Sequence, residues 1–340
     1  MIVDCAYYRE GERQHEGPMD LARAAEICSG DQSGFVWLGM FDPGPEELAE
    51  VQERFGLHDL AVEDAQTFHL RPKIEQYDNG AVYFAVLRTA RYAEEREEVE
   101  FGEVSVFMSA DFVITVRQGV ASELHAARLR LEHRPELMRE GSASVLWAIL
   151  DQIVDDYAPV IDGVEEDVEE VESIVFGGAA APTQRIYLLR REATEFYRAV
   201  HPLLAPLDAL ERGAYAQVSP ELRPFFRDVN DHLKLVNEEI VGLRDLLAVV
   251  LQANMAVISV QQNEATKRLA LVATIFLPLS FVAAFFGMNF GWLTENTTSV
   301  TTFLIAGVGA LVLCCVVVFF LIRAGGYLNS NQSGETFTDR

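Results

Sequence analysis

Carboxylate side chains are the most numerous groups in this sequence that could do chemistry, and what they do is attract and bind cations. The 340 residues include 52 Asp and Glu against 27 Lys and Arg, so the formal charge is −25. One acidic run spans 155–172 and consists of Asp155, Asp156, Asp162, Glu165, Glu166, Asp167, Glu169, Glu170 and Glu172. In a helical pattern such a run is more often a solvated face than a set of metal ligands, and we favour the solvated face.

The motifs by which common enzymes are identified are absent from the sequence. It has no glycine-rich phosphate loop with a Lys, no nucleophile elbow and no HExxH. The seven His are dispersed without metal-ligand spacing, and the four Cys form no CxxC pair or Cys/His cluster. The acidic charge also has the wrong sign for binding nucleic acid. We therefore predict a protein that is not an enzyme and that uses no organic cofactor and no nucleic-acid partner.

Two uncharged apolar segments lie near the C-terminus, at 269–286 and 300–322. A helix needs about 20 apolar residues to cross a bilayer, so both segments are predicted to span a membrane. The alternative is a pair of buried helices in a soluble protein, which rarely has two such runs so close together. From residue 263 onward the acids and bases balance, so the whole acidic excess lies in residues 1–262.

The basic residues near the spans predict how the chain is oriented. Lys267 and Arg268 precede the first span, Arg323 follows the second, and the loop 287–299 has no Lys or Arg. By the positive-inside rule, both termini are expected in the cytoplasm and the loop outside. The first 30 residues have no apolar signal segment. We expect a multi-pass protein of the plasma (inner) membrane, in contact with lipid.

A stripe of small or polar residues follows one side of the first span. Spacings of three and four give Asn263, Thr266, Leu269 or Ala270, Ala273, Leu277, Ser280, Ala284 and Gly287. The periodicity fits a helix-packing seam and the wall of a pore equally well. Because two spans cannot enclose a water-filled path, a pore would require a ring of identical subunits.

The polar part of the chain divides into a mixed lobe and a helical region. Strand patterns at 35–41, 81–88, 103–109 and 112–117 alternate with helical patterns at 45–55 and 122–133, which predicts an α/β or α+β lobe over 1–135. From 142 the pattern is helical, with a break at 177–182 before a second helix to about 210. A third helix begins near Glu221 and is predicted to continue into the first span as a rod on the order of 100 Å long.

The residues at the end of the first span resemble a known family. Phe286-Gly287-Met288-Asn289-Phe290 is similar to the hallmark of the CorA-type magnesium channels, in which Gly-Met-Asn follows the first of two C-terminal spans. The resemblance covers roughly 35–323 and includes Leu57-His58, Glu63-Asp64, Arg71-Pro72-Lys73-Ile74-Glu75, 226–232 and Pro278-Leu279-Ser280.

The resemblance implies a fold and a division of the chain. The fold is a funnel-shaped homopentameric channel, with an α/β N-terminal cytoplasmic domain, a long helical stalk and two transmembrane α-helices. The expected parts are a cytoplasmic α/β domain (1–140), a helical hairpin and stalk (141–268), pore-lining helix (269–286), outer loop (287–299), second span (300–322) and cytoplasmic tail (323–340).

The resemblance also implies roles for individual residues. Gly287, Met288 and Asn289 match the selectivity filter, and Glu295 is the only acid of the outer loop. The implied pore lining is Asn263, Thr266, Leu269, Ala273, Leu277, Ser280 and Ala284, with Leu269 and Leu277 as apolar constrictions. Asp228 matches the acid of a regulatory Mg²⁺ site between subunits, and either Glu94 or Glu95 is its expected partner.

The sequence departs from the family pattern at two places. Thr266 stands where a bulky apolar gate residue is frequent, so the constriction is expected at the two leucines of the stripe. The basic cluster after the second span is reduced to Arg323, which leaves a thin collar with Lys267 and Arg268.

The function implied is Mg²⁺ uptake, gated by internal Mg²⁺ bound between acidic cytoplasmic domains. Mg²⁺ is then both the transported and the regulatory ion. A Zn²⁺, Co²⁺ or Ni²⁺ transporter of the same family is one alternative, although the stripe has none of the His or Cys that such ions favour. The other alternative is a membrane-bound divalent-cation sensor that does not conduct.

Overall fold

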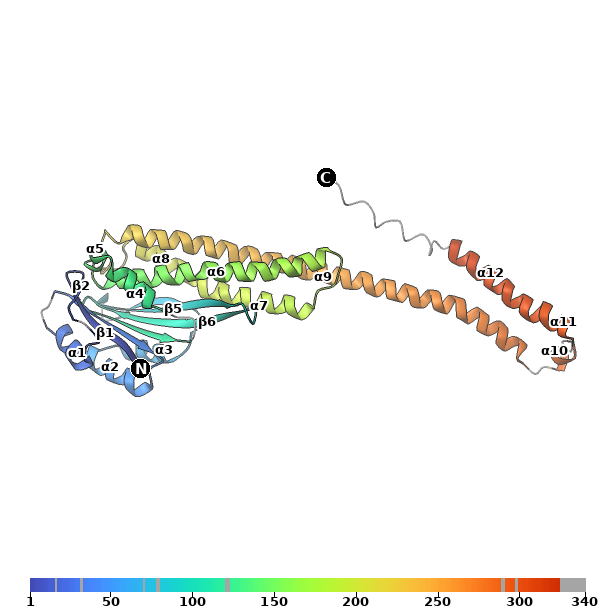
Figure 1. Ribbon diagram of the computed structural model, residues 1–340, viewed down its shortest axis with the longest axis horizontal. Coiled ribbons are helices and arrows are strands. Elements are labelled where there is room, and N and C mark those ends of the chain that lie inside the picture. The colour runs from blue at the N-terminus through green and yellow to red at the C-terminus, as the bar shows by residue number, and fades with distance from the viewer. Residues whose placement is uncertain are drawn as a thin grey trace. The chain divides into compact units, whose positions relative to one another are not determined.

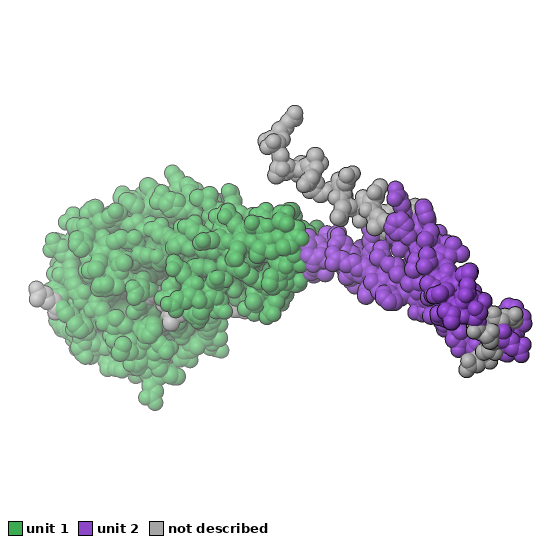
Figure 2. Space-filling model, turned by 45° about the vertical axis from the view of Figure 1, so that its right-hand side comes forward, with its two compact units in different colours: residues 1–254 green, residues 255–340 purple. Residues whose placement is uncertain are grey.

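The computed structural model describes residues 1–15, 17–30, 33–69, 71–77, 80–119, 123–288, 291–296 and 299–324 (Figure 1). The chain forms two compact units, Met1–Asn254 and Met255–Arg340 (Figure 2). One helix, α9 (Arg223–Phe286), contributes residues to both units. The predicted long helix that runs from the polar part of the chain into the first apolar segment is therefore confirmed.

A seven-stranded sheet forms the centre of the first unit. Its strands are β1 (Ile2–Arg9), β2 (Glu12–Arg13), β3 (Phe35–Phe41), β4 (Lys73–Tyr77), β5 (Val82–Ala93), β6 (Glu98–Met108) and β7 (Phe112–Gln118). They lie in the order β2-β1-β3-β7-β6-β5-β4, and every neighbouring pair is antiparallel except β3 and β7. The predicted hairpin between β6 and β7 is confirmed, and so is a sheet-containing N-terminal domain.

The hairpin of β5 and β6 is longer than the sequence pattern predicted. The expected strands ended at residue 88 and began again at 103, whereas pairing extends to Ala93 and Glu98. The added residues lack apolar alternation, and cross-strand pairs replace it: Arg91 forms a 2.6 Å ion pair with Glu100. Strand β1 and the short β2 and β4 were not predicted.

Three helices cover one face of the sheet: α1 (Leu21–Cys28), α2 (Pro45–Phe55) and α3 (Asp59–Gln66). Alternate residues of β3, such as Val36, Leu38 and Met40, are fully buried against them. Helix α2 matches its predicted bounds, because Pro45 sets its first turn and Gly56, at φ 64°, ends it in the left-handed conformation.

The opposite face carries the helices that follow the last strand in sequence (Figure 1). These are α4 (His125–Glu132), α5 (Pro135–Met138), α6 (Ser142–Phe176) and α7 (Thr183–Val200), followed by the 3-10 turn η2 (His201–Leu203) and α8 (Leu204–Glu211). Helices α6 and α7 pack on β5 and β6. The single helix predicted from 183 to about 210 is wrong, because Pro202 lacks the N–H that would continue α7.

Helix α9 starts two residues later than predicted, at Arg223, which places Pro224 in the first turn, where its missing N–H costs nothing. Up to Asn254 its buried residues recur every third or fourth position, from Phe226 to Val250. Phe225 contacts Trp147 of α6 ring to ring at 5.2 Å. Near the end of this unit the Asn254 amide binds both backbone groups of Ala181, at 2.9 and 3.2 Å, which attaches the α6–α7 turn to α9.

The second unit contains α9 from Met255 onward, α10 (Gly291–Asn296), α11 (Val300–Thr302), the π-helical segment η3 (Phe303–Val308) and α12 (Gly309–Ala324). Both α9 and the stretch Val300–Arg323 are long and apolar enough to cross a membrane. The second predicted span therefore exists as helix, with a π-helical stretch near its start.

Candidate ion pathway and regulatory acids

The predicted pore stripe lies on one exposed side of α9. All seven of its members have exposed side chains in the single chain: Asn263, Thr266, Leu269, Ala273, Leu277, Ser280 and Ala284. Its two leucines, Leu269 and Leu277, are each 72% exposed. The rest of this side of the helix carries small or polar residues. A surface with two leucines this exposed would be covered by a partner helix or would line a pore.

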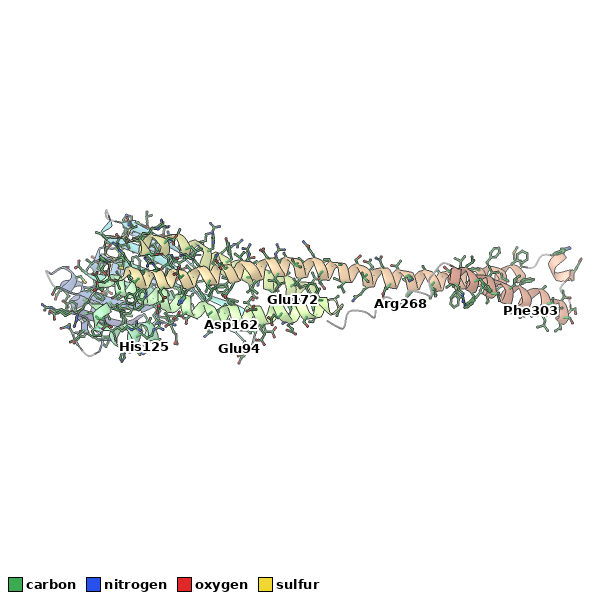
Figure 3. The ribbon with its side chains drawn as sticks, turned by 90° about the horizontal axis from the view of Figure 1, so that it is seen from above. Glu94, His125, Asp162, Glu172, Arg268 and Phe303 are labelled. Atoms are coloured by element: carbon green, nitrogen blue, oxygen red, sulfur yellow. The ribbon has the colours of Figure 1, made fainter. Side chains whose placement is uncertain are left out.

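Burial on α9 recurs on a different side from the stripe. Leu271, Ile275, Leu279, Val282 and Phe286 are partly buried, with helical spacing. On the second apolar helix the less exposed positions recur in the same way, from Ala306 to Ile322. The two helices run side by side in antiparallel directions (Figures 1 and 3). The partly buried residues of α9 therefore lie on another side than the stripe, which is uncovered together with Val272, Phe276 and Phe281.

The Gly-Met-Asn motif follows the end of α9 directly. The Gly287 N–H donates to the carbonyls of Ala283 and Ala284, at 3.0 and 3.1 Å, and completes the last turn. The Met288 side chain is 47% exposed. Asn289 lies outside the described residues, and Glu295 is exposed on α10. The filter assignment stays a prediction.

Asp228 is exposed near the start of α9. Asp151 of α6 lies close enough to interact electrostatically both with Asp228 and with Asp155 of its own helix. Burial raises the pKa of Asp151, and the negative charges of Asp155 and Asp228 add to this. Arg130 of α4 lies 3.6 Å from Asp151 and 3.9 Å from Asp155, which offsets part of the repulsion. The three carboxylates therefore form a cluster, named here the Asp228 cluster, that a cation would stabilise.

The expected partners of Asp228 lie elsewhere in the unit. Glu94 and Glu95 are both exposed in the turn between β5 and β6, and Figure 3 shows Glu94 pointing away from the helices. Among the described residues no set of three or more His, Cys, Asp or Glu is arranged to hold a metal within one chain. The regulatory pair would join two subunits, so it stays a prediction.

Comparison with known proteins bears on the whole chain. The family model described as CorA-like Mg²⁺ transporter protein matches residues 32–323. The chain belongs to this family. It is 29% identical over 268 residues to the cobalt/magnesium transport protein CorA of Thermotoga maritima, covering 78% of this chain and 76% of that one. It is also 22% identical over 300 residues to the corresponding protein of Methanocaldococcus jannaschii, covering 86% and 91% of the two chains.

A solved structure shares the fold of this CorA-like chain. The complete structure of the CorA magnesium transporter from Methanocaldococcus jannaschii matches with a TM-score of 0.72 and 18% identity, over 96% of this chain and 100% of that one. The full-length CmaX protein matches with a TM-score of 0.71 and 18% identity, over 95% and 97% of the two chains. These similarities establish the fold over both units.

The family signature between 57 and 75 forms a polar network at one end of the sheet. Lys73 of β4 binds Asp64 of α3 at 2.5 Å and Glu75 at 2.9 Å, and His69 approaches Asp64 at 3.3 Å. The His69 backbone N–H donates to the buried Glu103 at 2.6 Å. These contacts fasten β4 and the preceding turn to α3 and β6, so in this CorA-like chain the signature has a structural role.

The acidic run on α6 is mostly solvated, as predicted, with one exception. Asp167 is only 6% exposed, and it accepts hydrogen bonds from Tyr92 at 2.6 Å and from Arg185 at 3.3 Å. Arg185 also pairs with Glu97 and Glu170. The sequence pattern missed this contact because Tyr92 and Arg185 are distant from Asp167 in sequence. It attaches the end of the β5–β6 hairpin, next to Glu94 and Glu95, to α6 and α7.

Glu192 of α7 gives a prediction about stability and pH. Burial raises its pKa to about 7, and the charges of Glu98 and Asp167 add to this. The pKa of Glu192 in the folded protein thus exceeds its ordinary value of 4.5, so the folded state holds this proton more tightly than the unfolded state. Folding stability therefore falls as the pH rises from about 4.5 to 7. We expect Glu192→Gln to remove much of this loss, seen as a smaller decrease in Tm between pH 5 and pH 8 for the full-length protein in detergent.

The exposed Glu195, one turn further along α7, offers a matched control. Glu195→Gln should keep the native decrease in Tm. If Glu192→Gln also kept it, ionisation of Glu192 would not be the cause.

Proposed function

We propose that this protein is a homopentameric channel that takes up divalent cations, chiefly Mg²⁺, across the plasma membrane. The observation that carries the proposal is the uncharged stripe of small, polar and leucine residues on α9, whose members are all exposed and lie away from the partly buried side of the helix. Five such stripes around an axis would line one path. Membership of the CorA-like Mg²⁺ transporter family supports the same function.

The filter would work by holding a hydrated ion. Mg²⁺ loses its water reluctantly, and neutral amide oxygens from five copies of Asn289 would accept hydrogen bonds from the water shell. Glu295 would add a weak ring of negative charge outside. No His or Cys lies in the stripe, which favours a hard, hydrated ion over Zn²⁺ or Ni²⁺.

The gate would be apolar. Five copies of Leu269 and of Leu277 would form constrictions that close by excluding water. Opening would follow loss of Mg²⁺ from the inter-subunit sites of Asp228 with Glu94 or Glu95, because acidic domains then repel one another. Ions would enter down the membrane potential, which supplies about 2 × 2.3 kcal/mol per 100 mV for a divalent charge.

The proposed topology places both termini and residues 1–268 in the cytoplasm. Lys267 and Arg268 at one end of the first span and Arg323 at the end of the second support it. In this assignment 269–286 and 300–322 cross the membrane, 287–299 lies outside, and 323–340 is a cytoplasmic tail.

The apolar constriction gives a prediction of its own. Leu277→Ser would place five hydroxyl groups at one of the two proposed constrictions, so water would enter more easily. We expect the variant to carry at least about tenfold more Mg²⁺ than the native protein at an internal Mg²⁺ concentration that closes the native channel. The flux is measured with a Mg²⁺ indicator in liposomes. Leu279→Ser is the matched control, since Leu279 is partly buried outside the stripe. An equal rise in both variants would contradict the gate assignment.

Uptake of Mg²⁺ by liposomes containing the purified protein tests the function itself. We expect flux that depends on the protein and that Co²⁺ reduces, because the relative from Thermotoga maritima is named a cobalt/magnesium transport protein. Uptake of Zn²⁺ in preference to Mg²⁺ would favour the alternative transporter. Divalent-cation binding without any flux would favour the non-conducting sensor.

A further inference from the structure

The first unit has a cavity of about 840 Å³ on the sheet face opposite α1–α3. Its floor is low because three adjacent strands present small or short side chains there. Asp4 of β1 pairs with Gly39 of β3, which in turn pairs with Thr115 of β7. A Cβ added at Gly39 would be in ordinary van der Waals contact with Thr115, Asp4 and Arg128, at 3.7–3.9 Å, so the glycine keeps the floor low between these residues. The size is typical of small-molecule sites.

Helix α4 and the segment after β2 form the walls. Leu124, Leu129 and Val3 supply apolar surface, and Trp37 contributes to the floor. Helix α4 has only eight residues, so it covers the sheet face incompletely. His125 lies on the outer side of the unit at this wall (Figure 3).

The charge of the cavity is opposite to that of the chain. Three guanidinium groups line it, from Arg13, Arg117 and Arg128, and two imidazoles, from His15 and His125, accompany them. Two acids, Asp4 and Glu132, are among the residues of the lining that the structure describes. Although the chain has 52 acidic and 27 basic residues, the described lining thus has three guanidinium groups against two carboxylates. The cavity would therefore attract an anion, which the net negative charge of the chain otherwise repels.

The arginines are held in place before any ligand arrives. Asp4 accepts hydrogen bonds from Arg13, at 2.9 and 3.1 Å, and also from Arg128. Arg128 stacks on the Trp37 ring at 4.0 Å, and Arg117 on Phe41 at 5.4 Å. Burial lowers the pKa of Arg117, and the like charge of Arg128 contributes. Such preorganised cations lose little side-chain entropy on binding a phosphate.

We propose that this cavity binds a small soluble organic phosphate. Its apolar or planar part would lie on Leu124, Leu129 and Val3, and its phosphate would face Arg117 and the imidazoles of His15 and His125. Arg13, which already binds Asp4 and lies 3.6 Å from Glu132, would contribute only its charge. Guanidinium groups suit phosphate because their planar donors bind two of its oxygens at once.

The position of the cavity also suggests what binding would do. Helix α4 forms its wall through Arg128 and Leu129, and the next residue, Arg130, donates to Gln152 of α6 at 2.7 Å and faces Asp151 and Asp155. These acids belong to the Asp228 cluster, and Asp228 is the member to which the proposed function assigns a part in sensing Mg²⁺. A ligand that moves α4 would therefore alter the charge balance of that cluster, and this regulatory role rests on the proposed function.

Calorimetric titration of the full-length protein in detergent tests the binding. AMP serves as the probe, with adenosine and inorganic phosphate as its two separated halves. We expect AMP to bind and adenosine to bind at least tenfold more weakly. Leu129→Glu should weaken AMP binding at least tenfold, because it adds a negative charge at an exposed residue of the wall. Ala126→Glu adds the same charge to an exposed position of α4 outside the cavity and should change binding less than twofold.

Two results would overturn the site. One is no heat from AMP or phosphate up to 10 mM in the native protein; the other is equal weakening by both α4 variants. Regulation is tested in liposomes, where AMP should shift the internal Mg²⁺ concentration for half-closure in the native channel and leave it unchanged in Leu129→Glu. If the protein bound AMP but carried no Mg²⁺, the site would stand and the proposed function would fail. If it carried Mg²⁺ but bound no AMP, only the site would fail.

Discussion

Asn289→Ala is expected to reduce Mg²⁺ uptake by roughly 10- to 100-fold. The substitution removes the side-chain amide, so five copies would lose their ring of oxygen acceptors at the outer end of the pathway. A 10- to 100-fold loss corresponds to about 1.4–2.7 kcal/mol, which is about the contribution of two ordinary hydrogen bonds and so a modest demand on the five that would be lost. The Gly287 N–H bonds that end α9 involve backbone atoms, so the substitution leaves them in place.

Uptake is measured in liposomes with the native protein and two variants side by side. Asn296→Ala is the matched control, because Asn296 also follows α9 but lies outside the Gly-Met-Asn motif. It should transport at close to the native rate. Native transport by Asn289→Ala would exclude Asn289 from the filter, and equal loss in both variants would indicate damage to the outer segment as a whole.

The stripe on α9 could be predicted from the sequence because helical periodicity is a local property. Residues from Asn263 to Ala284 recur at three and four, and this spacing fixes them to one side of any helix that forms. Periodicity could not tell which side packs within the chain. The answer required the three-dimensional arrangement, in which the side of α9 with Ile275 and Leu279 is partly buried and the stripe is not.

Features that depend on distant strands were missed. Strand β1 contains Asp4 among apolar residues, and its pattern is uneven because Asp4 faces the cavity while Cys5 faces the core. The cavity itself has no sequence signal, because Asp4, Gly39 and Thr115 meet only through strand pairing. Asp167 was assigned to a solvated face for the same reason, since its partner Tyr92 is on β5.

Asp228→Lys is expected to abolish closure by Mg²⁺. Native channels in liposomes should close as internal Mg²⁺ rises, and the variant should keep conducting over the same range. The physical reason is that lysine replaces a cation ligand with a fixed positive charge, so a bound Mg²⁺ is repelled. The milder Asp228→Asn removes only the negative charge and should raise the half-closing Mg²⁺ concentration at least about tenfold.

Asp231→Asn provides the control for this series. Asp231 is exposed on α9, pairs with Lys234 at 3.3 Å and lies outside the Asp228 cluster, so its loss should leave half-closure within about twofold of native. Unchanged closure in Asp228→Lys would exclude Asp228 from the sensor, whereas an equal shift in Asp231→Asn would point to the general field of the acids.

The same assay identifies the partner of Asp228. Glu94 and Glu95 are adjacent and both exposed in the β5–β6 turn, so burial does not distinguish them. If a specific carboxylate binds Mg²⁺ with Asp228, Glu94→Gln and Glu95→Gln should differ, and only one should reproduce the shift of Asp228→Asn. Combining that variant with Asp228→Asn should then add little, because two changes to one ion site are not independent. Full additivity of the two shifts would mean that the residues act on separate sites.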